Sequence, residues 1–325
     1  MFSKDPDILV PYLSYGTSKE FYAIGRALND KPIELEKDQG LLDNLKDVYK
    51  LLESDEIRNA PLEIQLQDGS LYLSRTDKEG YYKTVNPHPD LDALADTEGW
   101  VSYQGNFENQ ENKFQGEMLI PSHKASFGII SDIDDTILQT GVTSTLKWQV
   151  VVNTLFKNFD QRLPLKNANI LYQKLHLNPD GEQVNPFFYV SNSPWNLYPY
   201  LQLFLKEHQF PKGPILLRDF GSPLQKFFAA EKPHKQKEIR NILKKYPTLN
   251  FILIGDSGEH DPDIYIDIAK EQPDRILAIY LRNVNHSGRM ERVQSLTDAY
   301  KDTPILMAKT SKEIEEHARA MGLIF

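Results

Sequence analysis

The first third of the chain alternates short apolar runs with turn-forming residues. Dipeptides such as Asp68-Gly69 and Glu79-Gly80 separate runs rich in β-branched and aromatic side chains, a pattern typical of antiparallel strands. Their spacing predicts a small sandwich of two sheets. One apolar stripe with helical spacing, over residues 42–52, interrupts the series. The expected strands are 8–10, 21–24, 62–66, 71–73, 81–85, 100–103 and 118–120.

From about residue 125 the pattern changes to short buried strands that alternate with amphipathic helices. A helix that begins near His234 has one apolar face, and Thr310 with Glu313 predicts a capping box for the last helix. This alternation predicts an α/β fold with a doubly wound parallel sheet. We therefore expect a β-rich domain over residues 1–124 and an α/β domain over residues 125–325. The expected strands of the second domain are 127–133, 187–191, 214–217, 251–255, 276–281 and 304–307.

Three carboxylates follow the first of these strands, at Asp132, Asp134 and Asp135. If the strand continues through Asp134, Asp132 and Asp134 point to the same side, because side chains alternate along a strand. Burying such charges is costly unless a cation offsets them. One carboxylate can attack phosphorus while the other protonates the leaving oxygen. An acidic turn is the alternative, and this motif alone does not decide between the two.

A serine and a lysine are expected at the same end of the sheet. Ser191 ends the strand at 187–191, and its hydroxyl can donate to a phosphoryl oxygen. Ser193 can instead cap a following helix that has Pro194 at its first position. Lys235 lies at a predicted helix start, where a lysine needs solvent or an anion. Capping and solvation explain these residues when each is taken alone, and His234 suits a structural role.

A second buried strand, at 251–255, also ends in acidic residues. Asp256 and Asp261 together with Asp132 would form an all-oxygen cluster of the kind that suits Mg²⁺. Zinc is disfavoured because the chain has no cysteine and its 8 histidines are scattered. The four motifs recur in order along an alternating chain, and each falls at a predicted carboxyl end of a strand or at a helix start. We therefore expect them to meet at one edge of the sheet.

Composition narrows the functional classes. The chain has 325 residues, of which 40% are hydrophobic, enough for two folded domains. The absence of cysteine excludes disulfides and cysteine nucleophiles. The N-terminus lacks a signal-peptide pattern, and no apolar run approaches the ~20 residues that span a bilayer. These features predict a cytoplasmic protein that is soluble or at most peripheral at membranes.

Charge is distributed unevenly along the chain. Residues 1–124 contain 13 Lys and Arg against 23 Asp and Glu, whereas residues 125–325 contain 24 against 23. The second part stays neutral although it holds the acidic motifs, so its other surfaces are mildly basic, which suits an anionic substrate. The sequence pI of about 5.5 and the lack of a basic stripe disfavour nucleic-acid binding.

Four sequence strings resemble those of the haloacid dehalogenase (HAD) superfamily of phosphotransferases. They are SDIDDTI at 131–137, YVSNSPW at 189–195, PKGPILLR at 211–218 and IGDSGEHDPDIY at 254–265. Within that superfamily they are most similar to the catalytic domain of the actin-patch-protein type of phosphatidate phosphatase. The resemblance covers roughly residues 125–310 and implies a HAD-like, Rossmann-like sheet. It also implies a Mg²⁺-dependent phosphatase that works through an aspartyl-phosphate and converts phosphatidate to diacylglycerol and phosphate.

The resemblance also implies a role for each motif residue. Asp132 would be the nucleophile, and Asp134 the general acid and later the base that activates water. Thr136 and Ser191 would hold the phosphoryl group. Lys235 would offset charge among the carboxylates, with Lys226 as the alternative lysine. The implied Mg²⁺ ligands are Asp132, Asp256, Asp261 and the backbone carbonyl of Asp134.

The nature of the substrate stays open at this point. Two strongly apolar segments, 146–159 and 195–205, and the pair Phe227-Phe228 are expected near the mouth of the site. Such segments are more often buried, but at a membrane surface they would admit an acyl chain. The alternatives are phosphatidate, a soluble phosphomonoester such as a metabolite or phosphoprotein, and a non-catalytic binding or scaffold protein. The four intact motifs argue against the last.

Overall fold

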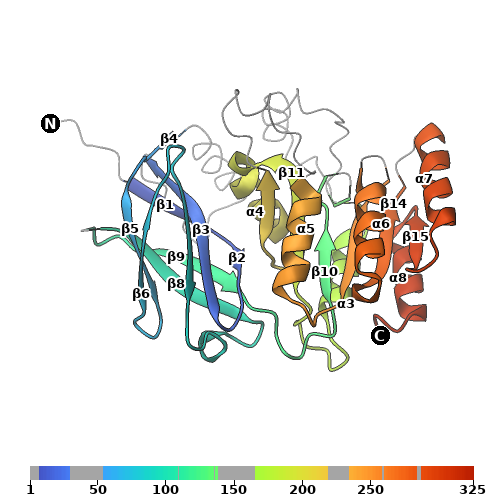
Figure 1. Ribbon diagram of the computed structural model, residues 1–325, viewed down its shortest axis with the longest axis horizontal. Helices are drawn as coiled ribbons and strands as arrows, with labels where there is room; N and C mark the ends of the chain where they lie inside the picture. The colour runs from blue at the N-terminus through green and yellow to red at the C-terminus, as the bar shows by residue number, and fades with distance from the viewer. Residues whose placement is uncertain are drawn as a thin grey trace. The chain divides into compact units, whose positions relative to one another are not determined.

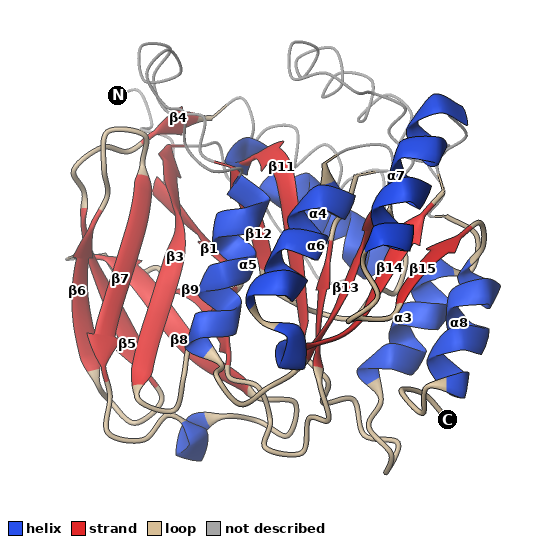
Figure 2. Cartoon of the chain, turned by 45° about the vertical axis from the view of Figure 1, so that its right-hand side comes forward, coloured by secondary structure: helices blue, strands red, loops and turns tan. Residues whose placement is uncertain are grey.

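The computed structural model describes residues 7–29, 54–108, 110–134, 136–137, 165–218, 234–257, 260–283 and 287–325 (Figures 1 and 2). The chain divides into two compact units. The first is Met1–Ser122 with Asn196–Leu203, and the second is His123–Trp195 with Phe204–Phe325. The predicted domain boundary between residues 124 and 125 stays a prediction.

The first unit contains two β-sheets that share one hydrophobic core. In one sheet, β3 (Glu20–Asn29) pairs antiparallel with β1 (Asp7–Tyr12), β4 (Asp55–Glu56) and β7 (Tyr81–Pro87). The described strands of the other sheet follow the order β2-β9-β8-β5-β6. Alternate side chains of both sheets, such as Phe21, Ile64 and Tyr103, fill the space between them. The strands of the second sheet are β2 (Ser14–Tyr15), β5 (Pro61–Leu66), β6 (Leu71–Arg75), β8 (Trp100–Phe107) and β9 (Phe114–Leu119).

Every strand that the sequence predicts in this unit overlaps an observed one. Gly69 and Gly80 have φ angles of +87° and +77°, a region that glycine enters without steric cost, so both turn predictions are confirmed. The strands β2 and β4 have two residues each, too few to produce an alternating pattern. The helical stripe predicted at 42–52 lies outside the described residues.

The second unit is built on a parallel sheet, which confirms the predicted α/β class. Its described strands follow the order β12-β11-β10-β13-β14-β15, and every neighbouring pair is parallel. The bounds are β10 (Gly128–Ser131), β11 (Phe187–Pro194), β12 (Ile215–Arg218), β13 (Phe251–Asp256), β14 (Ile276–Arg282) and β15 (Ile305–Ala308). The order reverses at β10, because β11 and β12 lie to one side of it and β13 to the other. Ligands bind at such a switch point, outside the carboxyl ends of the strands.

Helices pack against both faces of this sheet. On one face, Ser131 contacts Tyr172 of α3 (Ala168–His176), and Tyr280 contacts His317 of α8 (Ser311–Ala320). On the other face, the Tyr265 side chain of α6 (Asp261–Glu271) fills the space beside Gly255. The predicted helix at His234 is α5 (His234–Lys245), which is adjacent to α6. The described residues also form α4 (Tyr198–Glu207), whose residues up to Leu203 belong to the first unit, and α7 (Ser287–Ala299).

Three local predictions can be judged from these bounds. Strand β10 ends at Ser131, so the strand does not continue through Asp134 as the alternation argument assumed. Strand β11 continues to Pro194, so the interpretation of Ser193 as a helix cap is wrong. Thr310 is confirmed as the N-cap of α8, because the Glu313 N–H donates to Thr310 Oγ1 at 3.3 Å, whereas the Glu313 carboxylate accepts the N–H of Lys309 at 2.9 Å and not that of Thr310.

The apolar segment at 195–205 is mostly buried. Leu197, Tyr198, Tyr200, Leu201, Phe204 and Leu205 are all buried. Tyr198 stacks on Tyr12, and its hydroxyl oxygen accepts the Leu13 N–H at 2.6 Å. Burial is therefore the correct interpretation for this segment. Within the described part of the chain, no helix is long and apolar enough to cross a membrane.

Candidate functional site

Asp132 is the first residue after β10 and its position is fixed through the backbone. Its N–H donates to the Ile254 carbonyl of β13 at 2.8 Å, and its carbonyl accepts the Ser131 hydroxyl at 2.7 Å. Ser131 Oγ also lies 2.8 Å from the Tyr172 hydroxyl. The side chain of Asp132 is completely buried. A shift of the backbone at Asp132 would therefore break its hydrogen bonds with Ile254 and with the Ser131 side chain.

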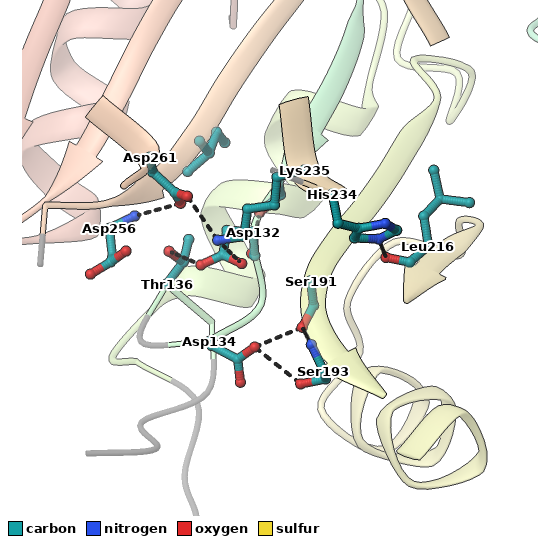
Figure 3. A network of polar contacts seen from close by, with 12 residues as sticks. Asp132, Asp134, Thr136, Ser191, Ser193, Leu216, His234, Lys235, Asp256 and Asp261 are labelled. Atoms are coloured by element: carbon teal, nitrogen blue, oxygen red, sulfur yellow. Dashed lines mark hydrogen bonds and ion pairs between the residues drawn. The ribbon is translucent and has the colours of Figure 1, made fainter. Parts of the chain in front are cut away.

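Lys235 connects this carboxylate to a second one (Figure 3). Its Nζ atom lies 2.8 Å from Asp132 Oδ1 and 2.7 Å from Asp261 Oδ1. All three residues are buried, and they come from the loop that follows β10, from α5 and from α6. Burial raises the pKa of Asp132 well above its ordinary value, the Lys235 ammonium lowers it, and the neighbouring carboxylates raise it further. The lysine therefore favours the ionised form that a nucleophile needs.

The negative charges of the carboxylate cluster around Lys235 can be offset by one more cation. Asp132, Asp256 and Asp261 each offer a carboxylate oxygen, and these oxygens lie within 4.8 Å of one another. All three residues are buried, and Lys235 is the ammonium that contacts two of them. Buried carboxylates in this number need more than one positive charge to offset them. An all-oxygen donor set of this kind fits a hard divalent cation.

Gly255 makes the position of Asp261 possible. A Cβ atom at Gly255 would lie 2.4 Å from Asp261 Oδ2 and 2.7 Å from Cε2 of Tyr265. The Tyr265 hydroxyl donates to the Ile254 carbonyl at 3.0 Å, so the ring has little freedom to move away. Burial raises the pKa of Tyr265 well above its ordinary value, and the nearby carboxylates raise it further, so the phenol stays neutral.

Replacing Gly255 with Ala is expected to destabilise the protein by about 1–3 kcal/mol, because the new methyl group overpacks the site. Urea unfolding measures the effect. Gly105→Ala is the matched control, because its Cβ would come within 3 Å of only the flexible end of Leu9, at 2.6 Å. An unfolding free energy for Gly255→Ala equal to that of the control would contradict this account.

Asp134 lies in a different setting from Asp132, among hydroxyls (Figure 3). Its Oδ2 atom accepts the Ser191 hydroxyl at 2.7 Å and the Ser193 hydroxyl at 3.2 Å. The Ser193 N–H donates to Ser191 Oγ at 2.9 Å. Thr136 donates its hydroxyl to Asp132 Oδ2 at 3.3 Å. The Lys235 ammonium thus contacts Asp132, and two serine hydroxyls donate to Asp134. These different settings suit Asp132 to attack and Asp134 to transfer a proton.

The sequence-predicted residues therefore fall into two adjoining groups. Asp132, Thr136, Lys235, Asp256 and Asp261 form the first. The second is formed by Asp134, two residues after Asp132 on the loop that follows β10, and Ser191 of β11. The alternative lysine Lys226, Asp135, the pair Phe227-Phe228 and the segment 146–159 lie outside the described residues.

Sequence reasoning missed three contributing side chains, Ser193, Tyr172 and Tyr265. Ser193 had a signal, because it follows Ser191 by the two-residue period of a strand. Tyr172 of α3 contacts Ser131, and Tyr265 of α6 donates to the Ile254 carbonyl. Nothing in the local sequence indicates which tyrosine of a helix will contact the end of a strand. His234 lies 3.4 Å from the Leu216 carbonyl through Nε2, and burial lowers its pKa, which is consistent with the structural role expected for it.

Comparisons with known proteins agree on one family. Residues 127–283 match the family model described as "Phosphatidate phosphatase APP1, catalytic domain". The chain is 32% identical over 244 residues to "Phosphatidate phosphatase APP1" of Saccharomyces cerevisiae, which covers 72% of this chain and 40% of that protein. It is also 32% identical over 157 residues to an uncharacterized protein of Schizosaccharomyces pombe, covering 48% of this chain and 25% of that protein. The chain thus spans less than half the length of either relative.

Among solved structures, a family 123 glycoside hydrolase from Clostridium perfringens aligns over 87% of this chain and 65% of its own. The identity is 9% and the TM-score 0.16, values that support no inference about fold or function.

Proposed function

Residues 127–283 belong to the family of phosphatidate phosphatase APP1 catalytic domains, and on this premise we propose that the protein is a Mg²⁺-dependent phosphatidate phosphatase. The reaction releases diacylglycerol and inorganic phosphate through an aspartyl-phosphate on Asp132. The parallel-sheet unit would have a HAD-like fold, in which the nucleophile follows a central strand at the switch point. The observation that carries the proposal is the setting of Asp132, a buried carboxylate held by Lys235 within a cluster of three carboxylates.

The first half-reaction uses the two aspartates in different roles. A carboxylate oxygen of Asp132 attacks phosphorus, and the bond between phosphorus and the ester oxygen breaks. The electron pair of that bond goes to the leaving oxygen, which takes a proton from Asp134. Lys235 supports the attack because its ammonium, 2.8 Å from Asp132 Oδ1, favours the ionised carboxylate.

The second half-reaction reverses the proton transfer. Asp134, now ionised, takes a proton from water, and the water oxygen attacks the phosphorus of the aspartyl-phosphate. Inorganic phosphate leaves and the Asp132 carboxylate is restored. The hydroxyls of Thr136 and Ser191 would turn from Asp132 and Asp134, where they now donate, to the phosphoryl oxygens.

The carboxylate cluster supports the proposed Mg²⁺. When bound, the ion would neutralise charge so that a carboxylate can approach a phosphate. Asp132, Asp256 and Asp261 would hold it, together with the backbone carbonyl of Asp134 as the expected fourth ligand. The lipid substrate is supported by the name of the yeast relative. The buried segment at 195–205 adds no support for membrane contact, and a peripheral membrane location and a cytoplasmic compartment stay predictions.

A phosphate-release assay tests the proposal. The full chain is incubated with phosphatidate in mixed micelles, with an aryl phosphate and with a panel of soluble phosphometabolites. We expect phosphatidate to be the preferred ester. We also expect chelation with EDTA to lower the rate by at least about 100-fold, since the metal supplies charge neutralisation, and added Mg²⁺ to restore it.

Two results would contradict the proposal. Turnover of a soluble ester far above that of phosphatidate would make the protein a phosphomonoesterase that uses the same residues. Failure to release phosphate from any ester, with Mg²⁺ present, would favour a binding protein.

Asp256→Asn should raise the Mg²⁺ concentration needed for half-maximal activity, whereas Asp267→Asn, on the exposed side of α6, should leave it unchanged.

A further inference from the structure

Ser193 contacts the second carboxylate of the site, although no role in the reaction follows from the motifs themselves. Its side chain is buried, and its hydroxyl donates to Asp134 Oδ2 at 3.2 Å. Its backbone N–H donates to Ser191 Oγ at 2.9 Å. Ser191 in turn donates to the same Asp134 oxygen at 2.7 Å. One serine therefore contacts both members of the proton-transfer group, through its side chain and through its backbone.

Both serines belong to β11, which continues to Pro194 with a register irregularity between Val190 and Pro194. Their hydroxyls nevertheless converge on one carboxylate. Asp134 receives both hydroxyls at Oδ2. The terminal torsion of an aspartate is broad, so each hydroxyl that donates to Oδ2 further restricts rotation of the carboxylate.

This arrangement matters most when substrate binds. In the proposed reaction Ser191 turns to a phosphoryl oxygen and no longer holds Asp134. The Ser193 hydroxyl can continue to donate to Oδ2. Its N–H still donates to Ser191 Oγ, so the single hydroxyl hydrogen of Ser191 is directed away from Ser193 and toward the phosphoryl group.

We propose that Ser193 is a positioning residue that holds Oδ2 of Asp134 so that Oδ1 delivers the proton to the leaving oxygen. This inference rests on the proposed phosphatase function. In the step that it serves, the bond from Asp132 to phosphorus forms and the bond from phosphorus to the ester oxygen breaks. The ester oxygen keeps the electron pair and takes the proton from Oδ1 of Asp134.

The dependence on the leaving group separates positioning from general structural damage. A basic alkoxide, as from glycerol 3-phosphate or phosphatidate, needs a proton as it leaves, whereas p-nitrophenolate leaves without much assistance. The ratio kcat/KM reports only the steps up to the first phosphoryl transfer, which is the step that includes departure of the leaving group. A poorly positioned acid therefore lowers kcat/KM for alkyl phosphates and spares the aryl phosphate.

The experiment compares Ser193→Ala, Ser193→Cys and Ser193→Thr in the full chain with both kinds of ester. For Ser193→Ala we expect kcat/KM to fall about 10- to 100-fold on the alkyl phosphate and less than about 3-fold on the aryl phosphate, part of the full contribution of a general acid. Ser193→Cys, which keeps the shape but donates weakly, should show the same selectivity, and Ser193→Thr should restore the alkyl rate. Thermal unfolding of each variant checks that it is folded.

The controls separate failure of this inference from failure of the proposed function. Asp134→Asn should show the same selectivity for aryl over alkyl ester with a larger loss, and Asp132→Asn should be inactive with both. Activity that survives in Asp132→Asn contradicts the phosphatase mechanism itself. Equal losses with both esters in folded Ser193→Ala or Ser193→Cys, or no loss with either, would overturn the positioning role while leaving that mechanism intact.

Discussion

Replacing Asp132 with Asn is expected to reduce Mg²⁺-dependent phosphate release by a factor on the order of 10⁴ or more, because an amide cannot form the covalent intermediate. The protein should nevertheless stay folded. Asn is nearly the same size as Asp, and it removes one of three clustered buried carboxylates while Lys235 keeps its contact with Asp261 at 2.7 Å. We therefore expect an unfolding free energy equal to or above that of the wild type, measured with urea in the absence of divalent cation.

Asp267→Asn makes the same chemical change at an exposed position on α6. It should leave both the rate of phosphate release and the unfolding free energy unchanged. Rapid acid quenching with a ³²P-labelled substrate should trap labelled protein in the wild type and not in Asp132→Asn. Wild-type turnover in Asp132→Asn, or label retained on that variant, would assign the nucleophile to another residue.

The sequence predicts the parallel sheet well because buried parallel strands are continuous apolar runs. The apolar run predicted as a strand at 251–255 corresponds to β13, which the structure bounds at Phe251–Asp256. Runs of β-branched and aromatic residues between turn pairs predicted the sandwich strands. This pattern missed very short strands such as β2, whose two residues pair with β9 only because the rest of the sheet brings them together.

Ser193 shows where local rules fail. The sequence Ser193-Pro194 fits a helix start, and judged locally that interpretation is the stronger one. In the structure Pro194 instead pairs with Arg218 of β12, after a register irregularity that follows Val190. Pairing with a distant strand thus overrides the capping preference. That pairing keeps Ser193 in a strand and on the same side as Ser191.

The contacts of Lys235 could not be predicted from the sequence alone. A lysine at the start of a helix opposes the helix dipole, so an anion or solvent has to be near it. The sequence favoured Lys235 and left Lys226, which lies outside the described residues, as the alternative. The packing of α5 beside α6 brings Nζ of Lys235 between two carboxylates.

Replacing Lys235 with Met should therefore affect both stability and activity. Removing one partner of a buried ionic cluster leaves uncompensated charge, and the typical cost is about 3–5 kcal/mol. Without the ammonium, Asp132 is also less favoured in its ionised form, since Lys235 is the group that lowers its pKa against burial. We expect phosphate release to fall by a factor on the order of 10³, the size of effect seen when a preorganised charge is removed from an active site.

A divalent cation should partly reverse the loss of stability. The three carboxylates of Asp132, Asp256 and Asp261 remain within 4.8 Å of one another, and a bound cation offsets the charge that Lys235 no longer balances. Saturating Mg²⁺ should therefore raise the midpoint of thermal unfolding more in Lys235→Met than in the wild type. Lys237→Met, an exposed position two residues further along α5, should match the wild type in stability, activity and response to Mg²⁺. A Lys235→Met protein as stable and as active as Lys237→Met would show that the ammonium between Asp132 and Asp261 is not what balances the cluster.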